Sequence, residues 1–132
     1  MSFDLYVEQV PGKGRGVFAG QPIPKGAIIE VCPVIVLSSK ESSVVEKTIL
    51  GSYIFKWPGT KQKAVDKNWT RSCVVLGNGS ILNHSSTPNT HWYIRQTKLV
   101  VVFRAKRLIN IGEELTHDYG WPKSYQTTLT EI

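Results

Sequence analysis

Residues 81–89, with the sequence ILNHSSTPN, decide the fold of this chain. An apolar pair comes first, and it is followed by short polar side chains that readily bond to nearby backbone groups. A polar run that contains an apolar pair predicts a loop pinned into the hydrophobic core. Taken alone, the stretch is equally typical of an ordinary turn rich in asparagine and serine.

Two further segments combine glycine with polar residues. Residues 11–19, PGKGRGVFA, carry glycines at alternate positions, which allow a backbone to approach a ligand closely. No buried strand precedes them and no helical pattern follows, so the dinucleotide-binding fingerprint fails and a hairpin turn is the alternative. Residues 111–121, IGEELTHDYGW, predict a turn, a short strand and an aromatic end, and Tyr119 taken alone is typical of a half-buried core residue.

The remaining pattern is that of a β-rich domain, because short Val, Ile, Tyr and Phe runs alternate with Gly, Pro and Asn. We predict a strand pair over residues 27–37 that is interrupted at Pro33, since proline cannot donate to a ladder. Residues 38–41 predict the cap of a short helix over 42–50. Residues 52–57 predict a strand with Tyr53, Phe55 and Trp57 on one face, and residues 91–105 predict a hairpin.

Length and composition fit one globular domain. The chain has 132 residues, of which 41% are hydrophobic and 20% charged. No stretch approaches the ~20 apolar residues of a membrane helix. Cys32 and Cys73 each lie beside apolar residues, which favours buried thiols in a reducing compartment. The start of the chain has no secretory signal pattern, so we expect an intracellular protein, with nuclear, cytoplasmic and host-delivered locations all left open.

Two other kinds of site fit the sequence poorly. The histidines and cysteines show no spacing typical of zinc ligands, so no metal is expected. A hydrolase built from Ser85, His84 and Asp118 has the right residue types, but the chain lacks the G-x-S-x-G nucleophile elbow.

Taken together and in this order, the three segments resemble the SET-domain family of protein lysine methyltransferases. Residues 13–19 resemble its N-terminal G-x-G motif, residues 81–89 its N-H-S-x-x-P-N motif, and residues 112–119 its G-E-E-L-x-x-D-Y motif. The similarity extends from Val7 to about Tyr125. Residues 53–55 also resemble a tyrosine-bearing strand of the small stand-alone viral and bacterial members.

The resemblance implies a mainly β, β-clip-like SET fold of several short sheets. Its C-terminal strand is expected to lie beneath the loop 83–89 in a pseudoknot-like threading. We expect a single SET domain over residues 1–132, with a core from about 5 to 125 and without the zinc-binding flanking segments of longer members.

The resemblance also implies methyl transfer from S-adenosylmethionine to a lysine ε-amine of a protein, with S-adenosylhomocysteine as the product. Tyr119 is then the catalytic residue. The implied cofactor-binding residues are Lys13, Gly14, Arg15, Asn83, His84, Tyr119 and Trp121. The implied channel for the substrate lysine is lined by Tyr53, Tyr119, Trp121 and Tyr125.

The charge balance indicates the partners. Sixteen basic residues oppose ten acidic ones, giving a net charge of +6 and a pI of about 9.4. This favours an acidic partner or a nucleosome-like context for a histone or other chromatin substrate, although a solvated basic domain without such a partner is equally consistent with it. The basic stretch of Lys56, Lys61, Lys63 and Lys67 is either a solvated loop or a contact to DNA or an acidic protein. A homodimer is also expected by resemblance to the viral members. A non-catalytic SET-fold reader or adaptor and a basic nucleic-acid-binding β-domain are the alternative functions.

Overall fold

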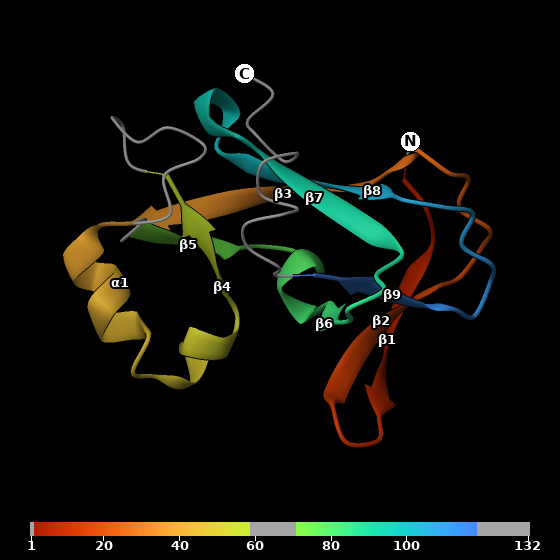
Figure 1. Cartoon of the computed structure of the whole chain (residues 1–132), viewed down its shortest axis with the longest axis horizontal. Coiled ribbons are helices and arrows are strands. Elements are labelled where there is room, and N and C mark those ends of the chain that lie inside the picture. The colour runs from red at the N-terminus through yellow and green to blue at the C-terminus, as the bar shows by residue number, and fades with distance from the viewer. Residues whose placement is uncertain (1, 59–70, 119–132) are drawn as a thin grey trace.

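The computed structural model describes residues 2–58 and 71–118, and its strands form two sheets (Figure 1). The strands are β1 Leu5–Val10, β2 Gly14–Ala19, β3 Ile28–Leu37, β4 Ile54–Trp57, β5 Arg71–Val75, β6 Asn83–His84, β7 Thr90–Arg95, β8 Val100–Ala105 and β9 Glu114–His117. The helices are α1 Ser39–Val45 and the short 3-10 turns η1 Ile49–Ser52, η2 Gly79–Ile81 and η3 Gln96–Lys98. Within the described residues, no helix has the length and apolar character needed to cross a membrane.

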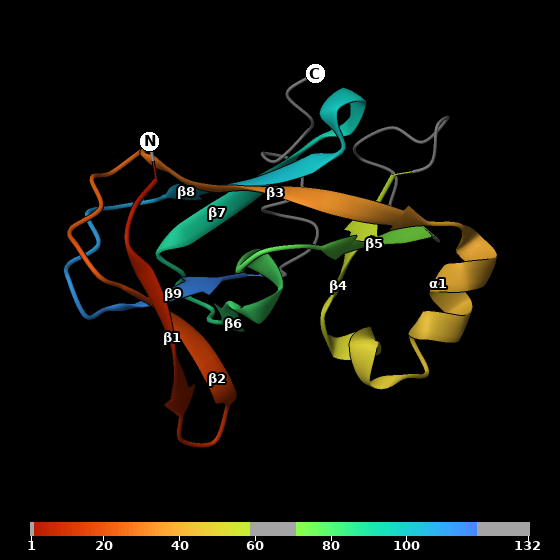
Figure 2. The same ribbon diagram turned by 180° about the vertical axis from the view of Figure 1, so that it is seen from behind.

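The first sheet has the strand order β1-β2-β9-β6, and the second has the order β4-β5-β3-β8-β7. The hairpin β1–β2 and the helix α1 lie at opposite ends of the molecule in both views (Figures 1 and 2). Strands β6 and β9 lie between these ends and pair in parallel. The mainly β fold of several short sheets that the sequence predicts is therefore confirmed.

The hydrophobic core fills the space between the sheets. Phe55 of β4 meets Trp92 of β7 edge to face, with ring centroids 5.1 Å apart, and meets Phe103 of β8 in the same way at 6.1 Å. His117 of β9 stacks on Phe55 at 5.4 Å. Aromatic pairs in these geometries add to the stability gained by burying the rings. The end of β9 is thus packed directly into the core.

Residues 83–90 are hydrogen-bonded along β9, as expected of a loop that lies over the C-terminal strand. The Ser85 amide donates to the His117 carbonyl over 2.9 Å, and the Thr90 hydroxyl donates to the Thr116 carbonyl over 2.6 Å. The Asn89 side-chain amide donates to the Glu114 carbonyl over 2.8 Å. These bonds satisfy three backbone carbonyl groups of a strand whose other edge pairs with β2.

The predicted interruption at Pro33 is wrong, because β3 runs continuously through it. The strand changes its hydrogen-bonded neighbour at this point: Pro33 is opposite Val100 of β8, whereas Val34 is opposite Val75 of β5. A missing N–H is tolerated where one ladder ends and the next begins.

The helix cap is confirmed, but the helix lies earlier in the chain than predicted, at Ser39–Val45 and not at 42–50. Ser38 and Glu41 form a reciprocal capping box in front of α1. The strand predicted over residues 52–57 begins only at Ile54, because η1 occupies the chain before it. Tyr53 is consequently 38% exposed, while Phe55 and Trp57 are buried.

Both cysteines are free thiols in the core, as the sequence predicts. Burial raises the pKa of Cys73 to about 12, and burial together with the charge of Glu30 raises the pKa of Cys32 to about 12. Both therefore stay protonated near neutral pH and behave as small apolar side chains.

His117 makes the stability of the fold depend on pH. Its ring is fully buried, and burial lowers its pKa from 6.5 to about 4. At a pH between these two pKa values, His117 is protonated in the unfolded chain but not in the folded chain. The free energy of unfolding therefore falls as the pH falls. We expect a loss of about 2 kcal/mol from this group between pH 7 and pH 5 in urea unfolding.

The matched variants for this measurement are H117Q and H91Q. The glutamine of H117Q has no charge to gain, so its stability should vary less over this range, whereas H91Q should retain most of the wild-type slope. Equal slopes in wild type and H117Q would contradict the assignment.

Candidate functional site

A cleft of about 370 Å³ lies where the β1–β2 hairpin meets residues 80–84. The hairpin contributes Gln9, Lys13, Gly14 and Arg15 to the lining of the cleft. The segment before β4 contributes Ser52 and Tyr53. Five of the seven residues predicted to bind the cofactor, Lys13, Gly14, Arg15, Asn83 and His84, thus border one cleft, although they come from segments far apart in the chain. The other two, Tyr119 and Trp121, lie outside the described residues.

The hairpin side of the cleft exposes backbone. Gly14 has a φ of +83°, and no heavy atom lies within 4 Å of the position that a Cβ would occupy. This left-handed conformation favours glycine, and the open space leaves the peptide groups accessible to a ligand. The hairpin register places Gln9 opposite Arg15, which brings a second polar side chain to the same place.

The other side of the cleft is held by Asn83, the first residue of β6. Its side-chain nitrogen donates to the Arg15 carbonyl over 2.9 Å and to the Glu114 carboxylate over 2.7 Å. One asparagine thus ties together the hairpin, β6 and β9. Both partners can only accept, so the orientation of the amide is fixed and its oxygen remains for a ligand that donates.

The turn that leads into residues 80–84 is anchored by Glu30 of β3. Its carboxylate accepts from the Asn78 backbone amide over 2.9 Å and from the Asn78 side chain over 3.0 Å. Gly77 lies beneath it with a φ of +77°, and a Cβ there would be 2.3 Å from a Glu30 oxygen. The start of η2 is therefore fixed by a side chain from the central strand of the second sheet.

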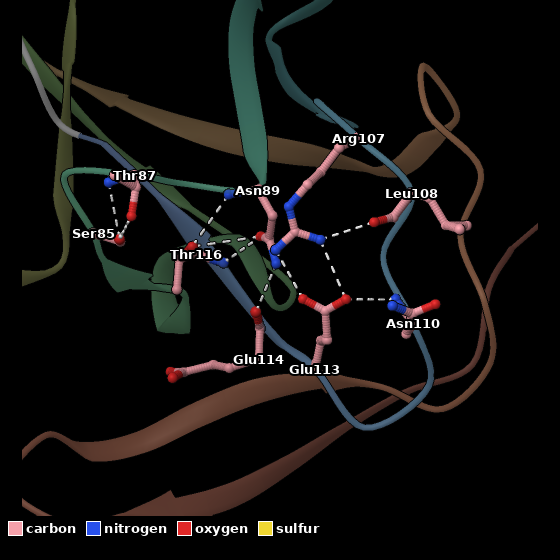
Figure 3. A network of polar contacts seen from close by, with 9 residues as sticks. All are labelled: Ser85, Thr87, Asn89, Arg107, Leu108, Asn110, Glu113, Glu114 and Thr116. Carbon is pink, nitrogen blue, oxygen red and sulfur yellow. Dashed lines mark hydrogen bonds and ion pairs between the residues drawn. The ribbon is translucent and has the colours of Figure 1, made fainter.

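The turn before β9 is fixed by a second carboxylate (Figure 3). Glu113 forms a two-point ion pair with Arg107, at 2.8 and 3.2 Å, and accepts from the Asn110 amide over 2.8 Å. The hydrogen bonds from Arg107 are the main reason that the pKa of Glu113 falls to about 2. Glu113 therefore holds the turn in place.

The residues considered for a hydrolase do not form a catalytic triad. The Ser85 hydroxyl accepts from the Thr87 amide over 3.0 Å within a local turn (Figure 3). His84 Nδ1 lies 3.6 Å from an Asp118 oxygen, next to the ends of β6 and β9. Within the described ranges, no group of three His, Cys, Asp or Glu side chains is placed to hold a metal ion.

A second cavity of about 320 Å³ adjoins the first and shares Arg15, Tyr53, Ser80 and Ile81 with it. Its other lining residues are aliphatic and come from η1, β4 and β5. Tyr53 therefore borders both cavities, and its place in a lysine channel stays a prediction. Tyr119, Trp121 and Tyr125 lie outside the described residues.

Sequence motifs alone do not reveal Gln9, Ser52 and Ser80, which also line the cleft. Of these three residues, only Gln9 could have been predicted from the sequence. A tight hairpin turn pairs residues that lie equally far before and after it, and this places Gln9 opposite Arg15. Ser52 and Ser80 reach the cleft through tertiary packing.

Comparison with known proteins agrees with this geometry. Residues 14–120 match the SET domain family. An H3 lysine-37-specific histone-lysine N-methyltransferase of Schizosaccharomyces pombe is 33% identical over 117 residues, which cover 88% of this chain and 73% of the relative. The N-lysine methyltransferase KMT5A-A of Xenopus laevis is 29% identical over 125 residues, and the match covers 88% of this chain but only 36% of that relative.

Solved structures share the fold. The Neurospora SET domain protein DIM-5, a histone lysine methyltransferase, superposes with a TM-score of 0.67 at 18% identity, covering 89% of this chain and 52% of that one. CpSET8 from Cryptosporidium superposes with a TM-score of 0.68 at 24% identity, covering 90% and 58%.

This chain belongs to the SET domain family, as its three motifs predict. The names of the relatives confirm the predicted enzyme class, protein-lysine N-methyltransferase, at the level of the family.

Proposed function

We propose that this chain, as one SET domain over its 132 residues, transfers a methyl group from S-adenosylmethionine to the ε-amine of a lysine in a histone or another chromatin protein. The observation that carries the proposal is the cleft at which residues 13–15 and 83–84 meet. The relatives named for histone-lysine methylation support the substrate class.

The residues of the cleft fit this cofactor. The open backbone at Gly14 and the cationic side chains of Lys13 and Arg15 suit its carboxylate and ribose, and the fixed amide oxygen of Asn83 suits its ammonium group. His84 would hold the adenine edge through backbone groups. When bound, S-adenosylmethionine supplies a methyl group on a positively charged sulfur.

The chain itself must supply a neutral lysine and an aligned approach. Because the ordinary pKa of a lysine side chain is ~10.4, only about one lysine in a thousand is neutral near pH 7.4. An aromatic channel of Tyr53, Tyr119, Trp121 and Tyr125 would remove water from the ammonium group and lower its pKa. The Tyr119 hydroxyl would then accept weak C–H···O contacts from the methyl group and stabilise the shifting charge. A phenol with a pKa near ~10 is a poor base at neutral pH, so the amine loses its proton to water.

The test of the function uses Y119F, which keeps the ring and removes the oxygen. Transfer of labelled methyl groups to histone proteins should fall by roughly 100-fold or more, because one transition-state acceptor is lost. Calorimetric binding of S-adenosylhomocysteine should stay within about threefold of wild type. A wild-type protein that binds the cofactor but never transfers methyl would instead support the reader or adaptor alternative.

We also propose that duplex DNA contacts a basic cluster at the end of the second sheet, formed by Lys25, Arg104 and Lys106, with His91 beside it. His91 and Arg104 are directly opposite each other on β7 and β8, and Arg104 donates to the Gly26 carbonyl over 2.9 Å. Burial, followed by the charges of Lys106 and Arg104, lowers the pKa of His91. None of the ion pairs in the described part of the chain involves these lysines or Arg104.

Lys56, from the stretch first expected to contact DNA, lies 3.7 Å from Glu46, and Lys61, Lys63 and Lys67 lie outside the described residues.

The double variant K25Q/K106Q should bind duplex DNA more weakly. The slope of log K against log salt should become less negative by about 2, one unit for each lost phosphate contact. The control K40Q/K47Q removes the same charge near α1, at the other end of the molecule. Equal losses in the two double variants would contradict the location of the contact.

The proposal extends to a homodimer. Val31 and Ile35 lie on one face of β3 and are 50% and 54% exposed. Two copies that each carry +6 repel one another, so an apolar face is the surface through which they can associate. We expect sedimentation equilibrium at micromolar concentration to give twice the chain mass, more completely at 500 than at 150 mM salt, and I35E to shift the population toward monomer. A monomer under all these conditions would exclude the dimer.

A further inference from the structure

Glu114 lies where the segments that form the cofactor cleft meet. It is not itself one of the residues that line the cleft. It is the first residue of β9 and lies opposite Phe18 of β2. Its side chain is only 18% exposed and extends over Gly16, where a Cβ would be 2.6 Å from a Glu114 carboxylate oxygen. A side chain at residue 16 would therefore displace the Glu114 carboxylate from its present position.

The carboxylate contacts two residues of the cleft from different parts of the chain. One oxygen accepts from the Asn83 side chain over 2.7 Å, and the other lies 4.0 Å from the Lys13 ammonium group. The exposed ion pair contributes little by itself. The short bond to Asn83 is charge-assisted and partly buried, so it is the stronger of the two.

This bond determines which atom Asn83 offers to a ligand. Its two N–H groups are occupied by the Arg15 carbonyl and by Glu114, so the amide oxygen is the group left for the cleft. Without the carboxylate, one N–H would lose its partner and the amide could rotate. An N–H facing an ammonium group would repel the ligand that the oxygen attracts.

We propose that Glu114 is a positioning residue for cofactor binding, which acts by holding the Asn83 amide with its oxygen available to the cofactor's ammonium group. This inference rests on the proposed function. Glu114 is expected to affect affinity for the cofactor and to leave the methyl-transfer step itself unchanged.

The experiment compares E114A with E114Q. E114A removes the acceptor, so the Kd for S-adenosylhomocysteine and the KM for S-adenosylmethionine should each rise about 10-fold, the size expected for one charge-assisted hydrogen bond. The kcat at saturating cofactor should stay within about twofold. E114Q retains an oxygen that can accept from Asn83, so its Kd should remain within about threefold of wild type.

A double-mutant cycle with N83A separates positioning from general structural damage. If Glu114 acts through Asn83, E114A should add little further loss of affinity in the N83A background. The same tenfold loss in both backgrounds would overturn the inference, as would an E114A variant that binds like wild type. Should E114A not fold, E114D replaces it, because the shorter side chain cannot reach Asn83 and the same loss is expected.

The matched control is E113Q, which removes the same charge from the neighbouring position. Glu113 pairs with Arg107 on the turn, so E113Q should leave the Kd unchanged. Binding of S-adenosylhomocysteine by the wild-type protein distinguishes a failure of the proposed function from a failure of the role of Glu114. A wild-type protein that does not bind S-adenosylhomocysteine refutes the function, whereas normal wild-type binding with no effect of E114A refutes only the role of Glu114.

Discussion

The structure depends on fixing a four-residue strand, β9, inside the protein by hydrogen bonds along both of its edges. Strand β2 pairs with one edge, and residues 83–90 bond to the rest through backbone atoms and the side chains of Asn89 and Thr90. Unpaired buried peptide groups are costly, so this set of bonds is required before His117 can stack on Phe55 in the core. The same bonds bring Asn83 and Glu114 against the hairpin, so folding β9 into place also forms the cleft.

The three carboxylates Glu30, Glu113 and Glu114 support different parts of the site because of where they lie in the fold. Glu30 fixes the turn that enters residues 80–84, and Glu113 fixes the turn that enters β9. Glu114 lies where β6, β9 and the β1–β2 hairpin come together. Hydrogen bonds accepted by Glu30 and Glu113 hold each of these turns in one geometry, and this supports the strands that begin after them.

Local patterns predict much of this molecule. Alternating glycines mark the hairpin turn, Ser38 and Glu41 mark the helix cap, and three short motifs identify the family. Long-range pairing accounts for the rest. Pro33 stays within a strand because β3 exchanges one neighbour for another there, and Gln9 and Ser80 reach the cleft through the packing of distant segments. The proposed role of Glu114 depends on its hydrogen bond to Asn83, 31 residues away in the chain, which no local pattern contains.

The most direct test is an NMR titration of the protein with S-adenosylhomocysteine. If residues 13–15 and 80–84 form the cofactor site, binding should be saturable, and the largest shifts of backbone amides should fall in these two segments, with little change in α1. Absence of saturable binding by the folded protein, or shifts confined to another part of the structure, would contradict the assignment of the cleft.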